Sequence, residues 1–341
     1  MLFQVGDKTY ILKNYFYSFF HTINGDNMII KLGYVALPLS LDITSSSTMT
    51  YTEFVKQNKP FNKLHDIIEK NLSHLYEILK YNQKNDVHFF RITSKLIPLA
   101  THKDVKYDYI TPHLKSFQKV AKLIQESNIR VDFHPDQFTV LNSTNSQVIQ
   151  NTFQILNYHF QILKALQIKH PILILHIGSN VFGKEKSMKR FIYHFKQLNP
   201  DIQKCIALEN DDKIFNIEDV LAISNEIKTP VVLDYHHHLC NHQEIDILPF
   251  FDKINNTWKE EKMKIHFSSP KDKTKKNIRS HHDFINADEF IHFLELIKGK
   301  NIDIDIMIEA KSKEEALFRL IRELKYKTNY RFIDETTFEV K

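Results

Sequence analysis

The chain has 341 residues, of which 42% are hydrophobic and 26% charged, a balance typical of a globular protein with one large domain or two smaller ones. Its formal net charge of +5 is compatible with a nucleic-acid surface without requiring one. The six glycines form neither a GxGxxG nor a Walker A pattern, which excludes the common glycine-rich phosphate loops. Two cysteines provide no disulfide framework and suit a reducing cytoplasm, and no apolar run is long enough to span a membrane.

Residues 1–27 are predicted to be an N-terminal extension, and residues 28–341 the folded domain. The extension contains an aromatic stretch, Tyr15–Phe20, but no small-residue cleavage site follows it, so we do not expect a signal peptide. The first strand-like run begins directly after Met28.

Eight short apolar runs with strand character then alternate with amphipathic helical patterns. The expected strands are Ile29–Val35, His88–Ile92, Arg130–His134, Ile172–His176, Cys205–Glu209, Val231–Asp234, Lys264–Phe267 and Ile304–Glu309. The expected helices are Asn62–Gln83, Leu114–Glu126, Ser146–Leu166, Lys186–Leu198, Ile217–Ile227, Ile245–Ile254, Asp288–Ile297 and Lys313–Lys325. Eight strand–helix units without a linker predict a single α/β domain, a (β/α)8 TIM barrel.

Residues with metal-binding side chains stand where these strands end. They are His134, His176, Glu209, Asp234, His266 and Glu309, with His102 in the loop after the second strand. In a barrel these ends converge on one cavity, where three carboxylates would repel one another unless cations balance them. Imidazole and carboxylate without thiolate favour Mn, Zn or Fe over Ca. We therefore predict a site for more than one divalent ion at the C-terminal face of the strands.

The sixth strand leads directly into this site through Asp234-Tyr235-His236-His237-His238. Asp234 and His237 are close enough in sequence for a turn to bring both to one ion. A polar turn with surface histidines is the alternative for this stretch alone. Glu209, in the middle of the set, could bridge two ions, an arrangement suited to phosphoester hydrolysis.

These residues lie in motifs that resemble the UV damage endonuclease family, which belongs to the endonuclease IV-like, xylose-isomerase-like barrels. The motifs are FRI (90–92), LIPLATH (96–102), HPDQF (134–138), LHIG (175–178), LENDD (208–212), DYHHH (234–238), KIH (264–266) and IEAK (308–311). They stand in family order over most of the chain, and ENDD and HPxQ are the most specific.

The resemblance implies an ATP-independent DNA repair endonuclease. It would nick double-stranded DNA immediately 5′ of UV photoproducts and other distorting lesions, leaving 3′-hydroxyl and 5′-phosphate ends, with two or three manganese ions. The implied ligands are His102, His134, His176, Glu209, Asp234, His237, His266, His281 and Glu309. At the eighth of these positions His282 is adjacent to His281 and remains an alternative. Glu209 and Lys264 are the expected catalytic residues.

The resemblance also implies that Lys264 is carboxylated. Lys264 and His266 are two apart on one strand and so face the same way. An ammonium among metal ions is hard to explain, and a carbamate would remove that conflict. The alternative is a lysine that extends to solvent at the rim of the site.

For DNA, the resemblance implies that Gln137 and Phe138 probe the lesion, with the aromatic ring wedged into the base stack. A phenylalanine in the core is the alternative for Phe138. Tyr34 matches a second probing aromatic, although Leu37 and Pro38 stand where the family often has asparagine.

Two other classes of function remain open from the sequence. One is another enzyme on the same barrel, an abasic-site endonuclease of the endonuclease IV type or a sugar isomerase. The other is a lesion-binding protein that does not cut. We expect a monomer in the bacterial cytoplasm, at the nucleoid when it acts, without a membrane partner.

Overall fold

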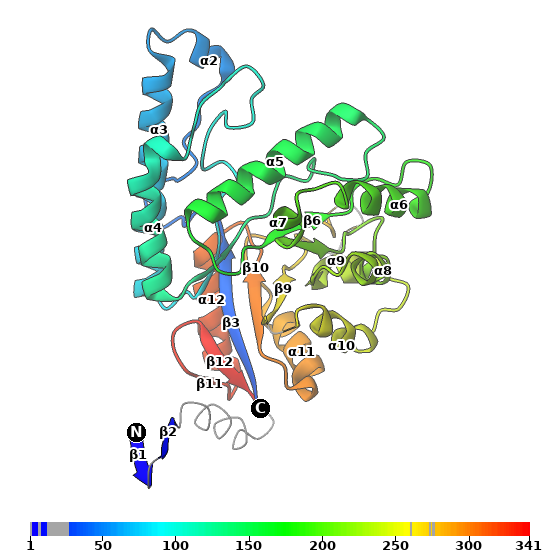
Figure 1. The fold of residues 1–341 in the computed structure, drawn as a ribbon. Helices are drawn as coiled ribbons and strands as arrows, with labels where there is room; N and C mark the ends of the chain where they lie inside the picture. Colours follow the sequence, from blue (N-terminus) through cyan, green and yellow to red (C-terminus); the bar gives the residue numbers. More distant parts are fainter. Residues whose placement is uncertain (1, 6–7, 12–26, 260, 273, 275–276) are drawn as a thin grey trace.

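Eight parallel strands form a barrel in the computed structural model, which describes residues 2–5, 8–11, 27–259, 261–272, 274 and 277–341 (Figure 1). The barrel strands are β3 (Met28–Val35), β4 (Phe89–Arg91), β5 (Arg130–Asp132), β6 (Leu173–His176), β7 (Ile206–Glu209), β8 (Val231–Asp234), β9 (Met263–Phe267) and β10 (Ile304–Ile308). Neighbouring strands pair in parallel from β6 through β10 to β3, β4 and β5. The predicted fold is confirmed.

The ring closes between β5 and β6 through a single parallel bridge that joins Phe133 and Leu173. The Phe133 N–H donates to the carbonyl of Ile172 at 3.1 Å, and the Ile174 N–H donates to the carbonyl of Phe133 at 3.0 Å. This seam lies directly before His134. From the seam, β6 continues to His176, so both histidines stand on the same side of the bridge, at the predicted site.

Helices cover the outside of the ring. They are α2 (Tyr51–Val55), α3 (Pro60–Lys84), η1 (Thr111–His113), α4 (Leu114–Ser127), α5 (Ser146–Ala165), α6 (Lys184–Phe195), α7 (Pro200–Gln203), α8 (Ile217–Ile227), α9 (Tyr235–Cys240), α10 (Leu248–Thr257), α11 (Ala287–Ile297), η2 (Lys298–Lys300) and α12 (Lys313–Lys327). All eight predicted helices are present, with ends shifted by at most three residues. The helices α2, α7 and α9 were not predicted from the sequence.

The longest helix shows why the pattern is readable. In α3, Leu64, Ile68, Leu72, Leu75 and Leu79 recur every three or four residues, and each is at most 1% exposed. Burial of one such side chain contributes about 1.5–3 kcal/mol, so this stripe holds the helix on the barrel.

Two pairs of strands were not predicted. β11 (Arg331–Phe332) and β12 (Thr337–Val340) pair with each other, and β12 adds antiparallel to the first half of β3. β4 pairs with the other end of β3, so that β3 has two different neighbours on one edge. β1 (Leu2–Val5) and β2 (Lys8–Ile11) form an antiparallel pair. Most of the predicted extension, residues 1–27, lies outside the described residues, so its separation from the domain stays a prediction.

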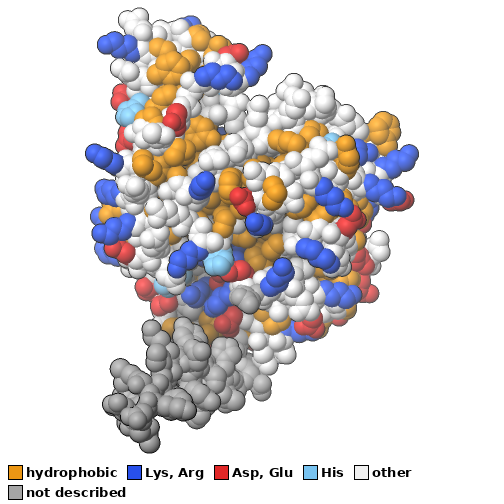
Figure 2. All heavy atoms as spheres, in the orientation of Figure 1, with side chains coloured by type: hydrophobic (Ala, Val, Ile, Leu, Met, Phe, Trp, Pro, Cys, Tyr) orange, Lys and Arg blue, Asp and Glu red, His pale blue; other side chains and the backbone are white. Residues whose placement is uncertain are grey.

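Charge is mixed on the face of the molecule that Figure 2 shows. Figure 2 shows lysines and arginines spread among acidic side chains on the visible face, without one dominant basic patch. Every described helix is too short or too polar to reach across a lipid bilayer.

Candidate active site and metal centre

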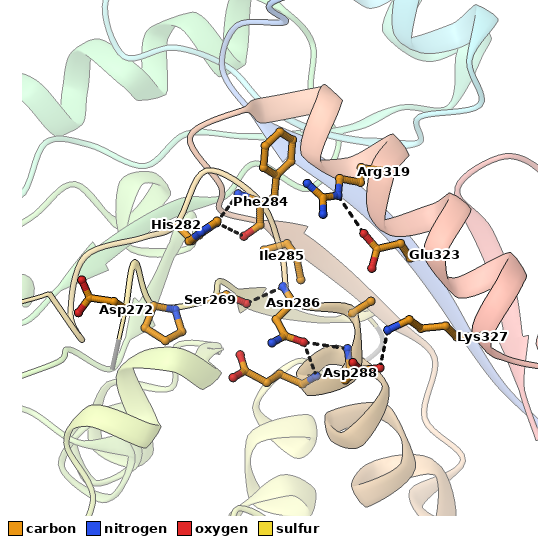
Figure 3. Close-up of a pocket in the computed structure, with 13 residues that line it drawn as sticks. Ser269, Asp272, His282, Phe284, Ile285, Asn286, Asp288, Arg319, Glu323 and Lys327 are labelled. Carbon is orange, nitrogen blue, oxygen red and sulfur yellow. Dashed lines mark hydrogen bonds and ion pairs between the residues drawn. The ribbon is translucent and has the colours of Figure 1, made fainter. Parts of the chain in front are cut away.

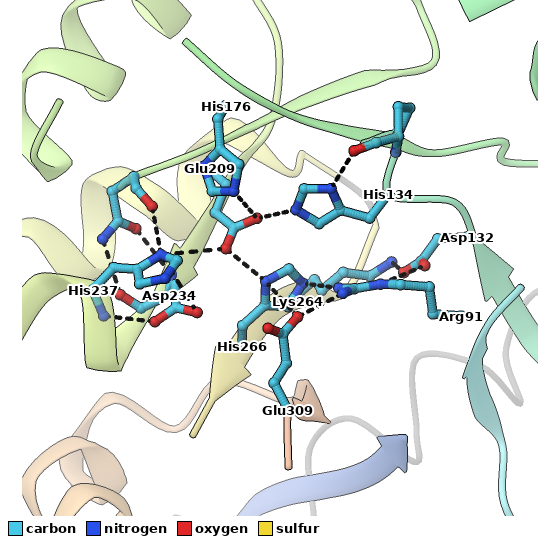
Figure 4. Close-up of polar contacts among 12 residues, drawn as sticks. Arg91, Asp132, His134, His176, Glu209, Asp234, His237, Lys264, His266 and Glu309 are labelled. Carbon is cyan, nitrogen blue, oxygen red and sulfur yellow. Dashed lines mark hydrogen bonds and ion pairs between the residues drawn. The ribbon is translucent and has the colours of Figure 1, made fainter. Parts of the chain in front are cut away.

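Glu209 is the centre of a cluster of side chains at the carboxyl ends of the strands (Figure 4). It ends β7, its side chain is 1% exposed, and two imidazoles contact it closely. His134 Nε2 lies 2.8 Å from Oε2, and His266 Nδ1 lies 3.0 Å from Oε1. His176 Nε2 and His237 Nδ1 are farther away, at 3.8 and 3.6 Å. Three strand ends and one helix thus direct imidazoles to a single carboxylate.

Asp234 links the end of β8 to this cluster by capping the short helix α9. Its Oδ1 accepts a hydrogen bond from the His237 N–H at 2.7 Å, and this cap starts a helix that carries the His237 ring back toward the site. Asn210 is fully buried and fixes both residues. Its side chain exchanges two 2.9 Å hydrogen bonds with the Asp234 backbone, and its carbonyl lies 3.0 Å from His237 Nδ1.

Glu309 follows β10 and is held by Arg91 from β4. Arg91 Nη1 donates to Glu309 Oε1 at 2.6 Å, and Arg91 Nη2 lies 2.6 Å from His266 Nε2. His266 Nδ1 in turn lies 3.4 Å from Glu309. The guanidinium therefore orients one carboxylate and one imidazole of the cluster at the same time.

A buried ion pair lies beneath the cluster, formed by residues that stand two positions before the ligands His134 and His266. Lys264 Nζ donates to Asp132 Oδ2 at 2.5 Å, and both side chains are 0% exposed. Arg91 Nε is 3.4 Å from the other oxygen of Asp132. Lys264 precedes His266 on β9 with the same orientation, as predicted, but its ammonium faces a carboxylate and the ring of Phe89, 4.4 Å from the ring centre.

Protonation in the cluster follows from burial opposed by neighbouring charge. Burial raises the pKa of Glu209, but His266, His176 and His134 outweigh it and bring the pKa well below its ordinary value. Burial lowers the pKa of His237, but Asp234 and Glu209 raise it to about 9. At His176 the effect of burial is larger than that of Glu209 and lowers the pKa to about 4. The cluster thus combines an ionised carboxylate, a neutral imidazole and an imidazole that takes up a proton.

Three overlapping groups in this cluster have the donor types and spacing for metal ions. They are His134, His176 and Glu209; Glu209, Asp234 and His237; and Asp234, His266 and Glu309, with ligand atoms within 4.8 Å of one another in each group. Glu209 and Asp234 each belong to two groups, so the groups can share a bridging carboxylate.

Two observations show that this cluster fits cations. Among the described residues, His176 Nδ1 and Asp234 Oδ2 are buried without a hydrogen-bond partner, which leaves lone pairs available. The site also has more carboxylates than cations when all are ionised. Among the described residues, the four carboxylates Asp132, Glu209, Asp234 and Glu309 outnumber the permanent or near-permanent cations beside them, which are Arg91, Lys264 and, near Glu309, Lys313. The raised pKa of His237 is one result of this excess, because a proton supplies the missing positive charge.

Comparison with known proteins agrees with this geometry. The family model for UV-endonuclease UvdE matches residues 30–339. The UV DNA damage endonuclease of Bacillus cereus (strain G9842) is 38% identical over 303 residues, covering 87% of this chain and 95% of the relative. That of Bacillus thuringiensis subsp. konkukian (strain 97-27) is 36% identical over 318 residues, covering 92% and 100%.

The chain belongs to the UV-endonuclease UvdE family. A solved structure from this family by name, SacUVDE, matches with a TM-score of 0.79 and 30% identity over 87% of this chain and 98% of the other. Endonuclease IV from Thermus thermophilus matches with a TM-score of 0.55 and 11% identity over 87% and 100%, which shows a shared barrel fold alone. The predicted family and its barrel are confirmed.

The structure brings most of the predicted UvdE ligands together, but separates one. His281 Nδ1 lies 4.0 Å from Glu309 Oε2, whereas His282 Nδ1 bonds to the backbone of Phe284 at the edge of a different cavity. The structure therefore favours His281 over His282. Neither His281 nor His102 is in a candidate group formed by described residues. His281 nevertheless lies beside Glu309, whereas the ring of His102 stacks on Tyr51 with centroids 4.2 Å apart.

Of the three residues predicted to contact DNA, two are exposed and one is buried. Phe138 is 75% exposed and Gln137 is exposed beside it, in a turn where the Phe138 N–H donates to Asp136 Oδ1 at 2.8 Å. The alternative of a core phenylalanine is therefore wrong. Tyr34 is 0% exposed, and its hydroxyl donates to Asn82 of α3 at 2.7 Å, so it cannot reach DNA in this conformation. Tyr34 is thus a core residue that packs between β3 and α3.

Arg91, Asp132 and Asn210 are parts of the site that the sequence analysis did not assign a role. Each stands in or beside a quoted motif or strand end, so position was the available signal. Asp132 also has the same two-residue spacing to His134 that Lys264 has to His266. For Lys264, the pairing with Asp132 gives the ammonium a counter-ion, so the conflict that favoured a carbamate is absent; carboxylation stays a prediction.

Two other features of the described residues lie apart from this cluster. A cavity of about 360 Å³ between the loop after β9, α11 and α12 contains no ligand of the cluster, and Asn286 already caps its helix (Figure 3). On α3 and η1, His65, Glu69 and His113 lie close together. Tyr107 joins the two imidazoles through its hydroxyl, and His113 pairs with Glu69 at 2.5 Å, so hydrogen bonds within the group account for this cluster.

Proposed function

We propose that this protein is a metal-dependent, ATP-independent DNA repair endonuclease. It nicks one strand of double-stranded DNA immediately 5′ of UV photoproducts and other distorting lesions and leaves 3′-hydroxyl and 5′-phosphate ends. The observation that carries the proposal is the set of three overlapping imidazole and carboxylate groups at the strand ends of a UvdE-family barrel. Relatives named UV DNA damage endonuclease support the substrate.

Manganese is the ion we propose, in two or three positions. His134, His176, Glu209, Asp234, His237, His266, His281 and Glu309 would hold the ions, and the sharing of Glu209 and Asp234 between groups supports more than one. Such ions, when bound, polarise a phosphodiester and make water a stronger nucleophile. His102 stays a candidate ligand from the family resemblance alone.

The protein supplies orientation to this site. Arg91 holds the side chains of Glu309 and His266, and Asn210 holds the backbone of Asp234 and the ring of His237, so three ligand side chains and the backbone of a fourth ligand are fixed by hydrogen bonds. Side chains held in this way lose little freedom when they bind an ion or a phosphate, which favours a fast reaction.

Gln137 and Phe138 act on the DNA. They stand exposed just beyond His134, so a ring that enters the base stack is adjacent to the cluster that cuts the backbone. A damaged pair stacks weakly and costs less to open than an intact pair, and this difference gives the preference for lesions.

The decisive experiment is a nicking assay on supercoiled plasmid, irradiated or not, with Mn²⁺ or with EDTA. We expect relaxed circles only with irradiation and Mn²⁺, and strand ends directly 5′ of the photoproduct when a labelled duplex is mapped. A plasmid with abasic sites tests the endonuclease IV type of activity. Binding to irradiated DNA without any nicking would instead identify a lesion-binding protein and contradict the proposal.

Adjacent histidines give a matched pair of variants for the same assay. His281→Ala removes the imidazole 4.0 Å from Glu309, whereas His282→Ala removes an exposed imidazole bonded to Phe284. We expect the first variant to lose nicking and the second to keep it. Equal activities would show that His281 is not part of the site.

A further inference from the structure

Phe182 is a second exposed phenylalanine in a loop that leaves the candidate metal site. It follows His176 and the end of β6, and its side chain is 74% exposed. Its φ is 65°, in the left-handed region that a bulky side chain rarely occupies. An exposed ring on a backbone outlier beside a candidate site is a reason to look for a function of this residue.

The loop of Phe182 is joined to the loop of Phe138 by one buried side chain. Asn142 Nδ2 donates to the carbonyl of Ser179 at 2.6 Å, and the Ser179 N–H donates back to Asn142 Oδ1 at 3.3 Å. Gly178 allows this approach, because a Cβ there would lie 2.5 Å from Asn142 Oδ1. The two loops are therefore held as one unit.

Arg190 of α6 strengthens this unit from outside. Its Nε donates to the carbonyl of Asn142 at 2.9 Å, and its Nη2 donates to the carbonyl of Val181, directly before Phe182, at 2.6 Å. The positions of the two loops relative to each other and to α6 are thus fixed by side-chain hydrogen bonds.

Both loops leave from neighbouring ligands of the cluster. The rings of His134 and His176 are 5.1 Å apart between centroids, and both imidazoles face Glu209. Phe138 follows the first ligand and Phe182 the second.

We propose that Phe182 is a second stacking contact for damaged duplex DNA, which acts together with Phe138 on the same face. This inference rests on the proposed function. Two rings on loops that are joined by hydrogen bonds can each cover a base or sugar exposed where the lesion disturbs the stack, and stacking on an aromatic ring does not depend on the base sequence. A single ring could enter many flexible sites, whereas two rings on linked loops favour DNA that is opened or bent.

The test compares Phe182→Ala and Phe182→Trp with wild type and with Tyr193→Ala. Tyr193 is a matched control, because it is an aromatic residue 64% exposed on α6, the helix that follows Phe182. Fluorescence anisotropy in EDTA measures binding to a duplex with one photoproduct and to the same duplex without it. Nicking in Mn²⁺ and metal content by elemental analysis are measured on the same preparations.

We expect Phe182→Ala to weaken binding to the lesion duplex by about 5- to 150-fold, the loss of one base–aromatic stacking contact, and to weaken binding to the intact duplex less. Phe182→Trp should restore the lesion affinity, and Tyr193→Ala should leave it unchanged. KM for nicking should rise, with metal content unaltered.

Two results would overturn the inference in distinguishable ways. Wild-type affinity and lesion preference in Phe182→Ala, beside a clear loss in Phe138→Ala, would show that Phe182 does not contact DNA. If the wild-type protein neither prefers nor nicks irradiated DNA, the proposed function fails, and the role of Phe182 fails with it.

Discussion

Replacement of Asp132 by asparagine tests the charges beneath the metal cluster. Asp132 and Lys264 form a fully buried pair with 2.5 Å between oxygen and nitrogen. Burial lowers the pKa of Lys264 to about 8, and the Asp132 carboxylate opposes a further fall. D132N keeps the shape of the side chain but removes the charge, so the pKa of Lys264 should fall well below neutrality.

The magnitude follows from the pKa values. In the wild type below pH 8, Lys264 is protonated in both folded and unfolded chains, so its titration does not change stability with pH. In the folded variant the lysine is neutral, whereas in the unfolded chain it still binds a proton. The unfolded state then binds more protons, and stability falls as pH falls. The loss relative to wild type should be about 1.4 kcal/mol at pH 7 and about 3 kcal/mol at pH 6 from this effect.

The assay is urea unfolding of metal-free protein at pH 6, 7 and 8. Trp258, the single tryptophan, is 2% exposed and donates to the Val231 carbonyl at 2.7 Å, so its fluorescence reports the barrel. Asp305→Asn is the matched control. Asp305 is also buried, but its partner at 2.6 Å is an arginine, Arg130, and not a lysine. It should lose stability without the dependence on pH.

A D132N variant whose stability relative to wild type does not change between pH 6 and pH 8 would refute this reasoning. A gain in stability would have a different meaning. A carbamate on Lys264 would be an anion beside Asp132, so removal of the Asp132 charge would relieve repulsion. The sign of the change therefore separates an ammonium from the carboxylated lysine predicted from the family resemblance.

Three further predictions concern the metal cluster and the DNA contact. Glu209→Gln should lose bound metal and nicking together while keeping the barrel by circular dichroism; retained metal by elemental analysis would contradict the central position of Glu209. Phe138→Ala should lose about 1–3 kcal/mol of binding to lesion duplex with unchanged metal content, and an unaltered preference for damaged DNA in a competition assay would argue against the wedge. Metal affinity should rise between pH 6 and pH 9, since His237, whose pKa is raised to about 9, must release its proton to bind an ion; calorimetry in buffers of different ionisation enthalpy would show no released proton if this is wrong.

The barrel was predictable because its strands are buried on both faces and so appear as short apolar runs. The elements that the sequence did not reveal depend on partners far away in the chain. β12 is stable as a strand because it adds to β3, and neighbouring side chains in TFEV alternate too briefly to show this. α9 contains three consecutive histidines, which are poor helix formers, and it forms because Asp234 caps it.

In the site, residue type at a strand end was enough to predict the metal ligands, but it did not predict the residues that hold those ligands in place. A histidine or glutamate at such a position is unusual enough to be noticed, whereas Arg91 resembles an ordinary surface arginine until Glu309 and His266 are placed beside it. Tyr34 shows the opposite error. The sequence identifies an aromatic residue at a strand end, but only the packing of α3 against β3 decides that its hydroxyl meets Asn82 and not DNA.

These supports form a second layer, and its charge explains why the site can be ordered before it binds ions. The upper layer has three carboxylates, Glu209, Asp234 and Glu309, which repel one another unless positive charge compensates them. One strand position lower, Asp132 offsets one of the two cations, Lys264 and Arg91, and leaves one positive charge directed upward through the Arg91 guanidinium. This charge is enough to hold Glu309 and His266 but not to neutralise three carboxylates. When His237 releases its proton, the negative charge of these carboxylates attracts divalent cations, while the hydrogen bonds of the lower layer already fix the side chains that would hold them.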